Sequence, residues 1–214
     1  MENRSMLTVI KEMPNQGAQE ILMLEIERAY YEARQFLPSI PEDINIRFDN
    51  EVLIEDQGVG GYAYSPDTLT VAFDLTFPDK DKQLVFLRET IFHGAMHLAQ
   101  NFTKETFKGN PIDEMVYEGV ATVFEREKAG ASPDYGQYEE YDEAEIQGWI
   151  AQIRELDEHY DYKQWKFYND EIGERWILYK AGTYVVDIVM KRTGRTIFEL
   201  AELSPAEVLE IARV

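Results

Sequence analysis

Two of the three histidines in this sequence have a spacing that suits metal binding. His93 and His97 are four positions apart, whereas His159 stands alone in an acidic stretch. On a helix, side chains at i and i+4 project from one face, so two imidazoles at this spacing can bind one ion. The sequence contains no cysteine, which excludes thiolate zinc sites, iron–sulfur clusters and disulfides. The spacing alone leaves open a second interpretation, in which both histidines only pack.

Glu118, twenty-one residues after His97, is the predicted third ligand. The helix expected there surrounds it with apolar side chains, and a buried carboxylate is costly unless it is paired or bound to a metal. Small residues at Gly119 and Ala121 would let this helix approach the histidine helix closely. Two histidines and one glutamate form a zinc triad with an open fourth position. We therefore expect zinc as the cofactor, bound by His93, His97 and Glu118.

These side chains need helices to position them, and the apolar pattern predicts several. The histidine helix is expected over 82–102; it is apolar on almost every side and therefore central. The Glu118 helix is expected to begin at Pro111 and to end near Lys128, before Gly130 and Pro133. Other helices are predicted at 18–37 and 175–190, with two capping-box helices at Thr196 with Glu199 and Ser204 with Glu207. Period-2 alternation predicts strands at 44–48 and 69–73, separated by a turn or hairpin at 58–67.

Length and charge bound the class of protein. The chain has 214 residues, which predicts a single domain over 1–214. Its net charge of −20 argues against nucleic acid and anionic membranes as partners. No signal-like or membrane-spanning apolar run is evident, so we expect a soluble cytoplasmic protein. The stretch 134–161 carries ten acidic residues, which favours a solvated helical face over a lid or an interaction surface.

The sequence also resembles a known group of proteins. A helical histidine pair followed about twenty residues later by glutamate is the metal-binding pattern of the gluzincin metallopeptidases. The segment Gly-Gly-Tyr-Ala-Tyr-Ser-Pro from Gly60, the strand after it, the histidine helix and Glu118-Gly119-Val120-Ala121 together look like the predicted zinc-dependent proteases long catalogued as a domain of unknown function. The resemblance covers about 58–124 well and, more loosely, the helix at 179–187. It implies an α+β, zincin-like fold: a small twisted, mostly antiparallel sheet packed on an active-site helix, and a mainly helical C-terminal part.

The chain departs from the family pattern at Gly94. Members of the group carry glutamate after the first histidine, where it acts as general base and acid, a contribution of about 10²–10⁴-fold. Three explanations stay open: natural loss of the base, a substitution made to silence the enzyme, or another carboxylate in its place. Glu89 and Glu114 are conceivable replacements, although a role that fixes a histidine, or a solvated position, is favoured for each. We expect a zinc-binding, peptidase-like protein of weak or absent activity, with no catalytic residue assigned.

Other candidates concern what surrounds the metal. The resemblance implies a tyrosine or histidine that stabilises an oxyanion, for which Tyr179, Tyr184 and His159 are candidates, although aromatic residues at helical spacing more often belong to the core. A peptide or protein is the expected ligand, held by added backbone hydrogen bonds on the strand at 69–73. The rival hypothesis is a metal-free, acidic protein-interaction module acting through 134–161. Substrate identity and oligomeric state are not predicted.

Overall fold

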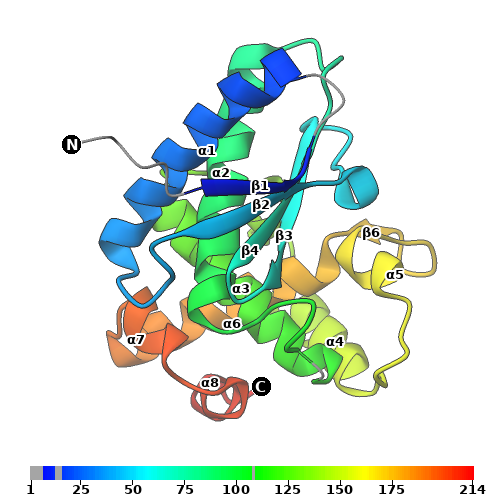
Figure 1. Ribbon diagram of the computed structural model, residues 1–214. Coiled ribbons are helices and arrows are strands. Elements are labelled where there is room, and N and C mark those ends of the chain that lie inside the picture. Colours follow the sequence, from blue (N-terminus) through cyan, green and yellow to red (C-terminus); the bar gives the residue numbers. More distant parts are fainter. Residues whose placement is uncertain (1–6, 13–15, 108) are drawn as a thin grey trace. The chain divides into compact units, whose positions relative to one another are not determined.

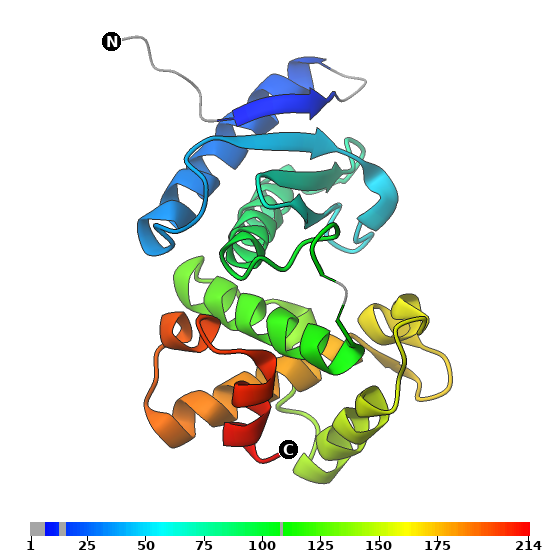
Figure 2. The ribbon, with the colours of Figure 1, turned by 60° about the horizontal axis from the view of Figure 1, so that its bottom comes forward.

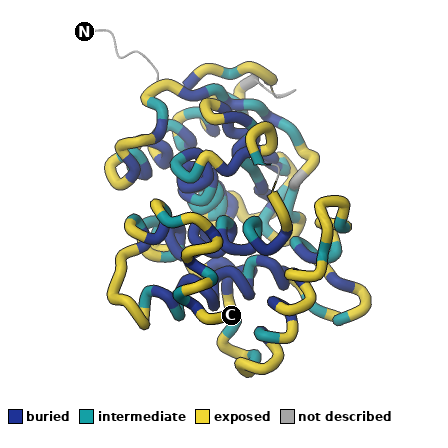
Figure 3. The backbone as a smooth tube through the Cα atoms, turned by 90° about the horizontal axis from the view of Figure 1, so that it is seen from below, coloured by how far each residue is buried: buried dark blue, intermediate teal, exposed yellow. Residues whose placement is uncertain are grey.

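The computed structural model describes residues 7–12, 16–107 and 109–214. The chain forms two compact units, Met1–Phe107 and Lys108–Val214. Buried positions gather in the interior of each unit, while loops and helix ends are exposed (Figure 3). The N-terminal unit is α+β and contains the main sheet, whereas the C-terminal unit is mainly helical. The predicted α+β class and the helical C-terminal part are thereby confirmed.

The sheet of the N-terminal unit has the strand order β1-β2-β4-β3 (Figure 1). Its strands are β1 (Leu7–Lys11), β2 (Ile44–Phe48), β3 (Val59–Ser65) and β4 (Thr68–Phe73). The β1–β2 and β2–β4 pairs are parallel and only β3–β4 is antiparallel. The sheet is therefore mixed, and the prediction of a mostly antiparallel sheet is wrong. A crossover through α1 makes β1 and β2 parallel, and the β3–β4 hairpin inserts β4 beside β2 rather than β3.

The strands form where the sequence alternates. Ile44, Ile46 and Phe48 are buried while Asn45 and Arg47 between them are only half-buried, as the period-2 pattern predicts. The segment 58–67 forms the outer strand β3 and the tight turn into β4, so the predicted hairpin is present. Within it, a Cβ at Gly61 would lie 2.7 Å from the Thr70 carbonyl oxygen and 2.8 Å from the Thr90 methyl carbon. A glycine there allows α2 to approach the sheet closely.

β4 lies inside the sheet, and this corrects the prediction that residues 69–73 bind a peptide. Its backbone groups pair with β2 on one side and with β3 on the other. The edge strands of this sheet are β1 and β3, and the edge next to β4 is that of β3. Part of that edge is already used, because the backbone nitrogens of Lys104 and Glu105 donate to the carbonyls of Ala63 and Tyr64 at 2.9 and 3.1 Å.

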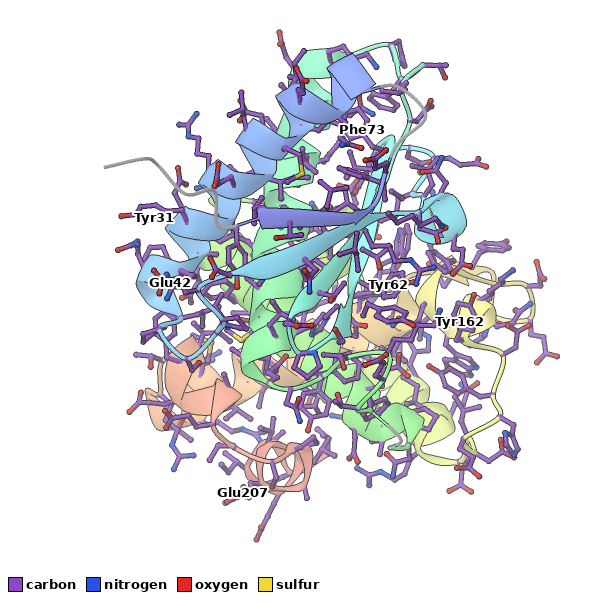
Figure 4. All side chains as sticks on the ribbon, in the orientation of Figure 1. Tyr31, Glu42, Tyr62, Phe73, Tyr162 and Glu207 are labelled. Atoms are coloured by element: carbon purple, nitrogen blue, oxygen red, sulfur yellow. The ribbon has the colours of Figure 1, made fainter. Side chains whose placement is uncertain are left out.

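Two long helices, α1 (Gln16–Phe36) and α2 (Lys80–Ala99), lie on one side of the sheet (Figures 1 and 2). α1 buries one stripe of side chains and exposes Ile21, Leu24 and Tyr31 on another; Tyr31 points away from the unit (Figure 4). The Asp79 side chain caps the start of α2 by accepting from the Lys82 nitrogen. The short 3-10 helix η1 (Asn50–Val52) follows β2.

The C-terminal unit is built around α3 (Pro111–Lys128) and α6 (Ile177–Thr193). Pro111 occupies the first turn of α3 and the Asn110 side chain accepts from the Asp113 nitrogen, which together explain the predicted start. The remaining elements are η2 (Asp134–Gly136), α4 (Glu143–Arg154), α5 (Tyr162–Lys166), β5 (Tyr168–Asn169), β6 (Glu174–Arg175), α7 (Ile197–Ala201) and α8 (Pro205–Ala212) (Figure 2). The two predicted capping boxes start α7 and α8.

α3 and α6 cross at two glycines. A Cβ at Gly119 would lie 2.3 Å from backbone atoms of Gly182, and one at Gly182 would lie 2.1 Å from the Met115 carbonyl oxygen. Gly119, which was expected to admit the histidine helix, thus serves the contact with α6. The two helices are also joined by Arg126, whose guanidinium donates to both carboxylate oxygens of Asp187 at 3.0 and 2.5 Å.

The acidic stretch 134–161 is helical over α4, as the favoured interpretation predicted. α4 starts with a capping box between Asp142 and Glu145 and buries its apolar face through Ile146, Trp149, Ile150 and Ile153. Most of its acidic residues are exposed. Among the described residues, no helix is long and apolar enough to cross a membrane.

Candidate metal centre

The histidine pair lies on the last two turns of α2. The ring centroids of His93 and His97 are 4.6 Å apart and the rings meet edge to face at 83°. Both residues therefore project from one face of the helix, as the i, i+4 spacing predicts. Two imidazoles in this arrangement supply neutral nitrogen donors of the kind that zinc binds.

His97 is buried, whereas His93 is half-buried. His97 is only 4% exposed, and its ring packs edge to face against that of Phe102, with the ring centroids 4.8 Å apart. Its Nδ1 lies 3.2 Å from Oε1 of Gln100. An amide oxygen there accepts from Nδ1–H, which leaves Nε2 as the lone-pair donor for a metal. Gln100, one turn further along, is thus a positioning residue that the sequence argument did not identify.

Gly94 directly follows His93 and is buried under the sheet. A Cβ built there would lie 3.0 Å from Leu69 Cδ2, and the other two nearest atoms, at 3.7 and 4.0 Å, belong to the same side chain. Leu69 is a strand residue whose branched end can change rotamer. A Cβ at position 94 therefore requires the Leu69 side chain, and not backbone, to shift by a few tenths of an ångström.

Glu118 occupies the middle of α3 and is only 3% exposed. A carboxylate this deeply buried needs a partner to remain charged. Its partner is Lys166, whose Nζ donates to Glu118 Oε1 at 2.6 Å. The same ammonium donates to Glu114 Oε1 at 2.8 Å, so one cation joins two carboxylates a helical turn apart. The C-terminal unit therefore contains a buried ionic cluster on the face of α3 that carries Glu118.

The cluster extends to two tyrosines. Tyr160 donates its hydroxyl to Glu114 Oε2 at 2.7 Å, and the Lys166 ammonium lies 5.7 Å from the centre of the Tyr179 ring. Burial lowers the pKa of Lys166, but Glu118, Tyr179 and Glu114 outweigh it and the pKa ends well above its usual value. Burial, with Glu118 beside it, raises the pKa of the Tyr179 phenol. At neutral pH Lys166 is thus an ammonium and both tyrosines are neutral.

The three oxyanion candidates lie in different surroundings. Tyr179 is next to the Lys166 ammonium that contacts Glu118. Tyr184 packs edge to face against Tyr138 at 5.5 Å, a core contact. His159 has a side chain that is 85% exposed. Of the three, Tyr179 is the one in the neighbourhood of Glu118.

The two carboxylates considered as replacement bases also differ. Both oxygens of Glu114 accept hydrogen bonds, one from Tyr160 and one from Lys166. The favoured prediction, a partner that fixes a histidine or a solvated side chain, differs from these contacts with Tyr160 and Lys166. Glu89 is half-buried on α2, one turn before His93. No pattern pointed to Lys166, which lies 48 residues from Glu118 in sequence.

The donor types fit zinc. The histidine pair offers two imidazoles on one helix face, and Glu118 offers a buried carboxylate in the middle of α3. Imidazole and carboxylate in a two-to-one ratio form a common catalytic zinc set, and an amide that orients one histidine is the usual supporting contact. Removing either helix from the chain would leave the set incomplete.

Comparison with known proteins identifies the family. The protein-family model described as "Predicted Zn-dependent protease (DUF2268)" matches residues 24–210. Searches of curated proteins and of solved structures returned no match. The matched range spans both compact units and includes His93, Gly94, His97 and Glu118. The chain belongs to this family of predicted zinc-dependent proteases.

Proposed function

We propose that the chain is a zincin-like metallopeptidase relative that binds zinc through His93, His97 and Glu118. We further propose that Gly94, in place of the general-base glutamate, leaves its peptidase activity weak or absent. The family match over residues 24–210 is the observation that carries the proposal. Because that match spans both compact units, we treat 1–214 as one functional domain.

The chemistry of the donors supports the choice of metal. His93, His97 and Glu118 form a group that could hold a metal ion. When bound by such a set, zinc acts as a Lewis acid that polarises a carbonyl and activates water. The chain's own residues supply the rest: Gln100 orients His97, and the Lys166 ammonium donates a hydrogen bond to Glu118.

The absence of a base beside His93 supports weak activity. Gly94 has no side chain, and its neighbour across the helix–sheet contact is the apolar Leu69. Both carboxylate oxygens of Glu114 already accept hydrogen bonds, one from Tyr160 and one from Lys166. Loss of a general base lowers a hydrolytic rate by about 10²–10⁴-fold.

A peptide or protein remains the proposed ligand, and β3 rather than β4 offers it an edge. Residues 60–62 of β3 lie between Val59, whose carbonyl accepts from the Ile54 nitrogen at 3.1 Å, and the part of the strand that Lys104 and Glu105 already cover. An extended peptide could add to this stretch through backbone hydrogen bonds. Tyr179 is the proposed oxyanion donor, because its phenol stays protonated in the cluster.

Replacement of Gly94 tests this function. Gly94→Glu should gain hydrolysis of unstructured peptides by at least about tenfold over the natural chain, since it supplies the absent base. Gly94→Ala, which fills the same space without a carboxylate, is the matched control and should not gain activity. Addition of His97→Ala to Gly94→Glu should remove the gain.

A folded Gly94→Glu variant that binds zinc but cleaves nothing in a broad peptide library would contradict the degenerate-peptidase account. A chain that binds no zinc in any variant would instead favour the metal-free interaction module.

A further inference from the structure

We propose that Lys166 is a built-in cation of the Glu114–Glu118 pair, and that a divalent metal at Glu118 binds in competition with its ammonium. The inference rests on the proposed zinc function and goes beyond it, because it assigns a regulatory residue outside the ligand set. It concerns how strongly the chain binds metal and what replaces the metal when none is present.

The geometry of the cluster carries the first step. Lys166 Nζ lies 2.6 Å from Glu118 Oε1 and 2.8 Å from Glu114 Oε1, both within hydrogen-bonding distance. The lysine side chain is only 18% exposed, and those of the two glutamates are 3% and 14% exposed. Charge-assisted hydrogen bonds this far from solvent are much stronger than surface ion pairs.

The charges give the second step. Without Lys166, two carboxylates at i and i+4 would face the same buried space, where like charges repel strongly. The ammonium therefore stabilises the metal-free protein. A divalent cation would satisfy Glu118 equally well, but with Lys166 present it must approach a carboxylate that is already neutralised. The cation that stabilises the metal-free chain thus lowers its affinity for metal.

The position of Lys166 gives the third step. It is the last residue of α5, a helix of five residues followed directly by the short strands β5 and β6. Lys163 lies on the same helix and is exposed. Its backbone nitrogen donates to the capping side chain of Asp161. The two lysines thus differ in their contact with the carboxylates while sharing charge and helix, which provides a matched control.

The test compares Lys166→Met with Lys163→Met in the full chain. Two quantities are measured: zinc affinity, by competition with a chromophoric chelator, and the unfolding midpoint of chelator-treated protein. Lys166→Met should bind zinc at least about tenfold more tightly, because a positive charge beside the ligand is gone. Its metal-free form should unfold at a lower temperature, whereas Lys163→Met should change neither value.

Opposite changes in the two quantities distinguish a competing cation from a merely structural contact, whose loss would lower both. If metal-free Lys166→Met fails to fold, Glu114→Gln/Lys166→Met removes the like-charge repulsion and should still bind zinc more tightly than Glu114→Gln. If the natural chain binds zinc through His97 but Lys166→Met binds it no more tightly, this inference is overturned and the proposed zinc function is not. Absence of zinc binding in both chains would overturn the proposed function as well.

Discussion

The helices α2 and α3 each place a glycine directly after a proposed metal ligand, yet the two glycines serve different purposes. Gly119, after Glu118, lies where a Cβ would be 2.3 Å from the backbone of Gly182. Gly94, after His93, faces the end of the Leu69 side chain at 3.0 Å. Backbone in a helix crossing cannot move locally, but a leucine can change rotamer. The packing therefore requires glycine at 119, whereas at 94 it only tolerates it.

The two glycines therefore bear on different properties: Gly119 on the fold and Gly94 on the proposed chemistry. The glycine that the fold requires says nothing about catalysis, because any residue with a side chain would separate α3 from α6. Under the proposed function, the glycine that the fold does not require occupies the position of the general base. Gly94 is thus the better candidate for a residue whose identity changes the reaction and not the structure.

The largest expected effect is that of Gly119→Ala. Its new methyl would overlap backbone atoms of Gly182, and overpacking of this severity destabilises a protein by about 3 kcal/mol. The free energy of unfolding, measured in urea, should fall by that amount. Gly148→Ala on α4 is the control: a Cβ there meets nothing within 4 Å, and the better helix propensity should stabilise by up to about 1 kcal/mol. Equal effects at 119 and 148 would contradict the assigned crossing.

Gly94→Ala is expected to have a much smaller effect. Alanine gains about 1 kcal/mol over glycine in a helix interior, and the displacement of Leu69 offsets part of that gain. The free energy of unfolding should stay within about 1 kcal/mol of the natural chain, measured in the same urea titration. A loss as large as that of Gly119→Ala would show that residue 94 is a packing glycine after all, and the comparison between the two helices would fail.

Local patterns predicted much of the fold. The bounds of α3 agree with the prediction because Pro111 starts the helix and the residues around Gly130 end it, both through contacts a few residues away. The capping boxes of α7 and α8 are local in the same sense. Strand β1 was not predicted, and the sheet is mixed and not mostly antiparallel as predicted, because pairing between distant strands depends on contacts that no short window contains.

The candidate site shows the same limit. The i, i+4 spacing places His93 and His97 on one face of α2. These two proposed ligands can therefore be predicted from the sequence. The cation that pairs with Glu118 cannot be predicted in this way, because Lys166 lies on a short helix 48 residues away in sequence. A buried carboxylate predicts that some cation must be present, but burial alone cannot identify which one.

The central claim, that His93, His97 and Glu118 bind zinc, is tested most directly by metal analysis. The chain should be purified without a nickel column, and its zinc content measured by inductively coupled plasma mass spectrometry. We predict near-stoichiometric zinc in the natural chain and its loss in His97→Ala, with Gln137→Ala as a control that keeps the metal. Absence of zinc from carefully prepared natural protein, or zinc that persists undiminished in His97→Ala, would contradict the account.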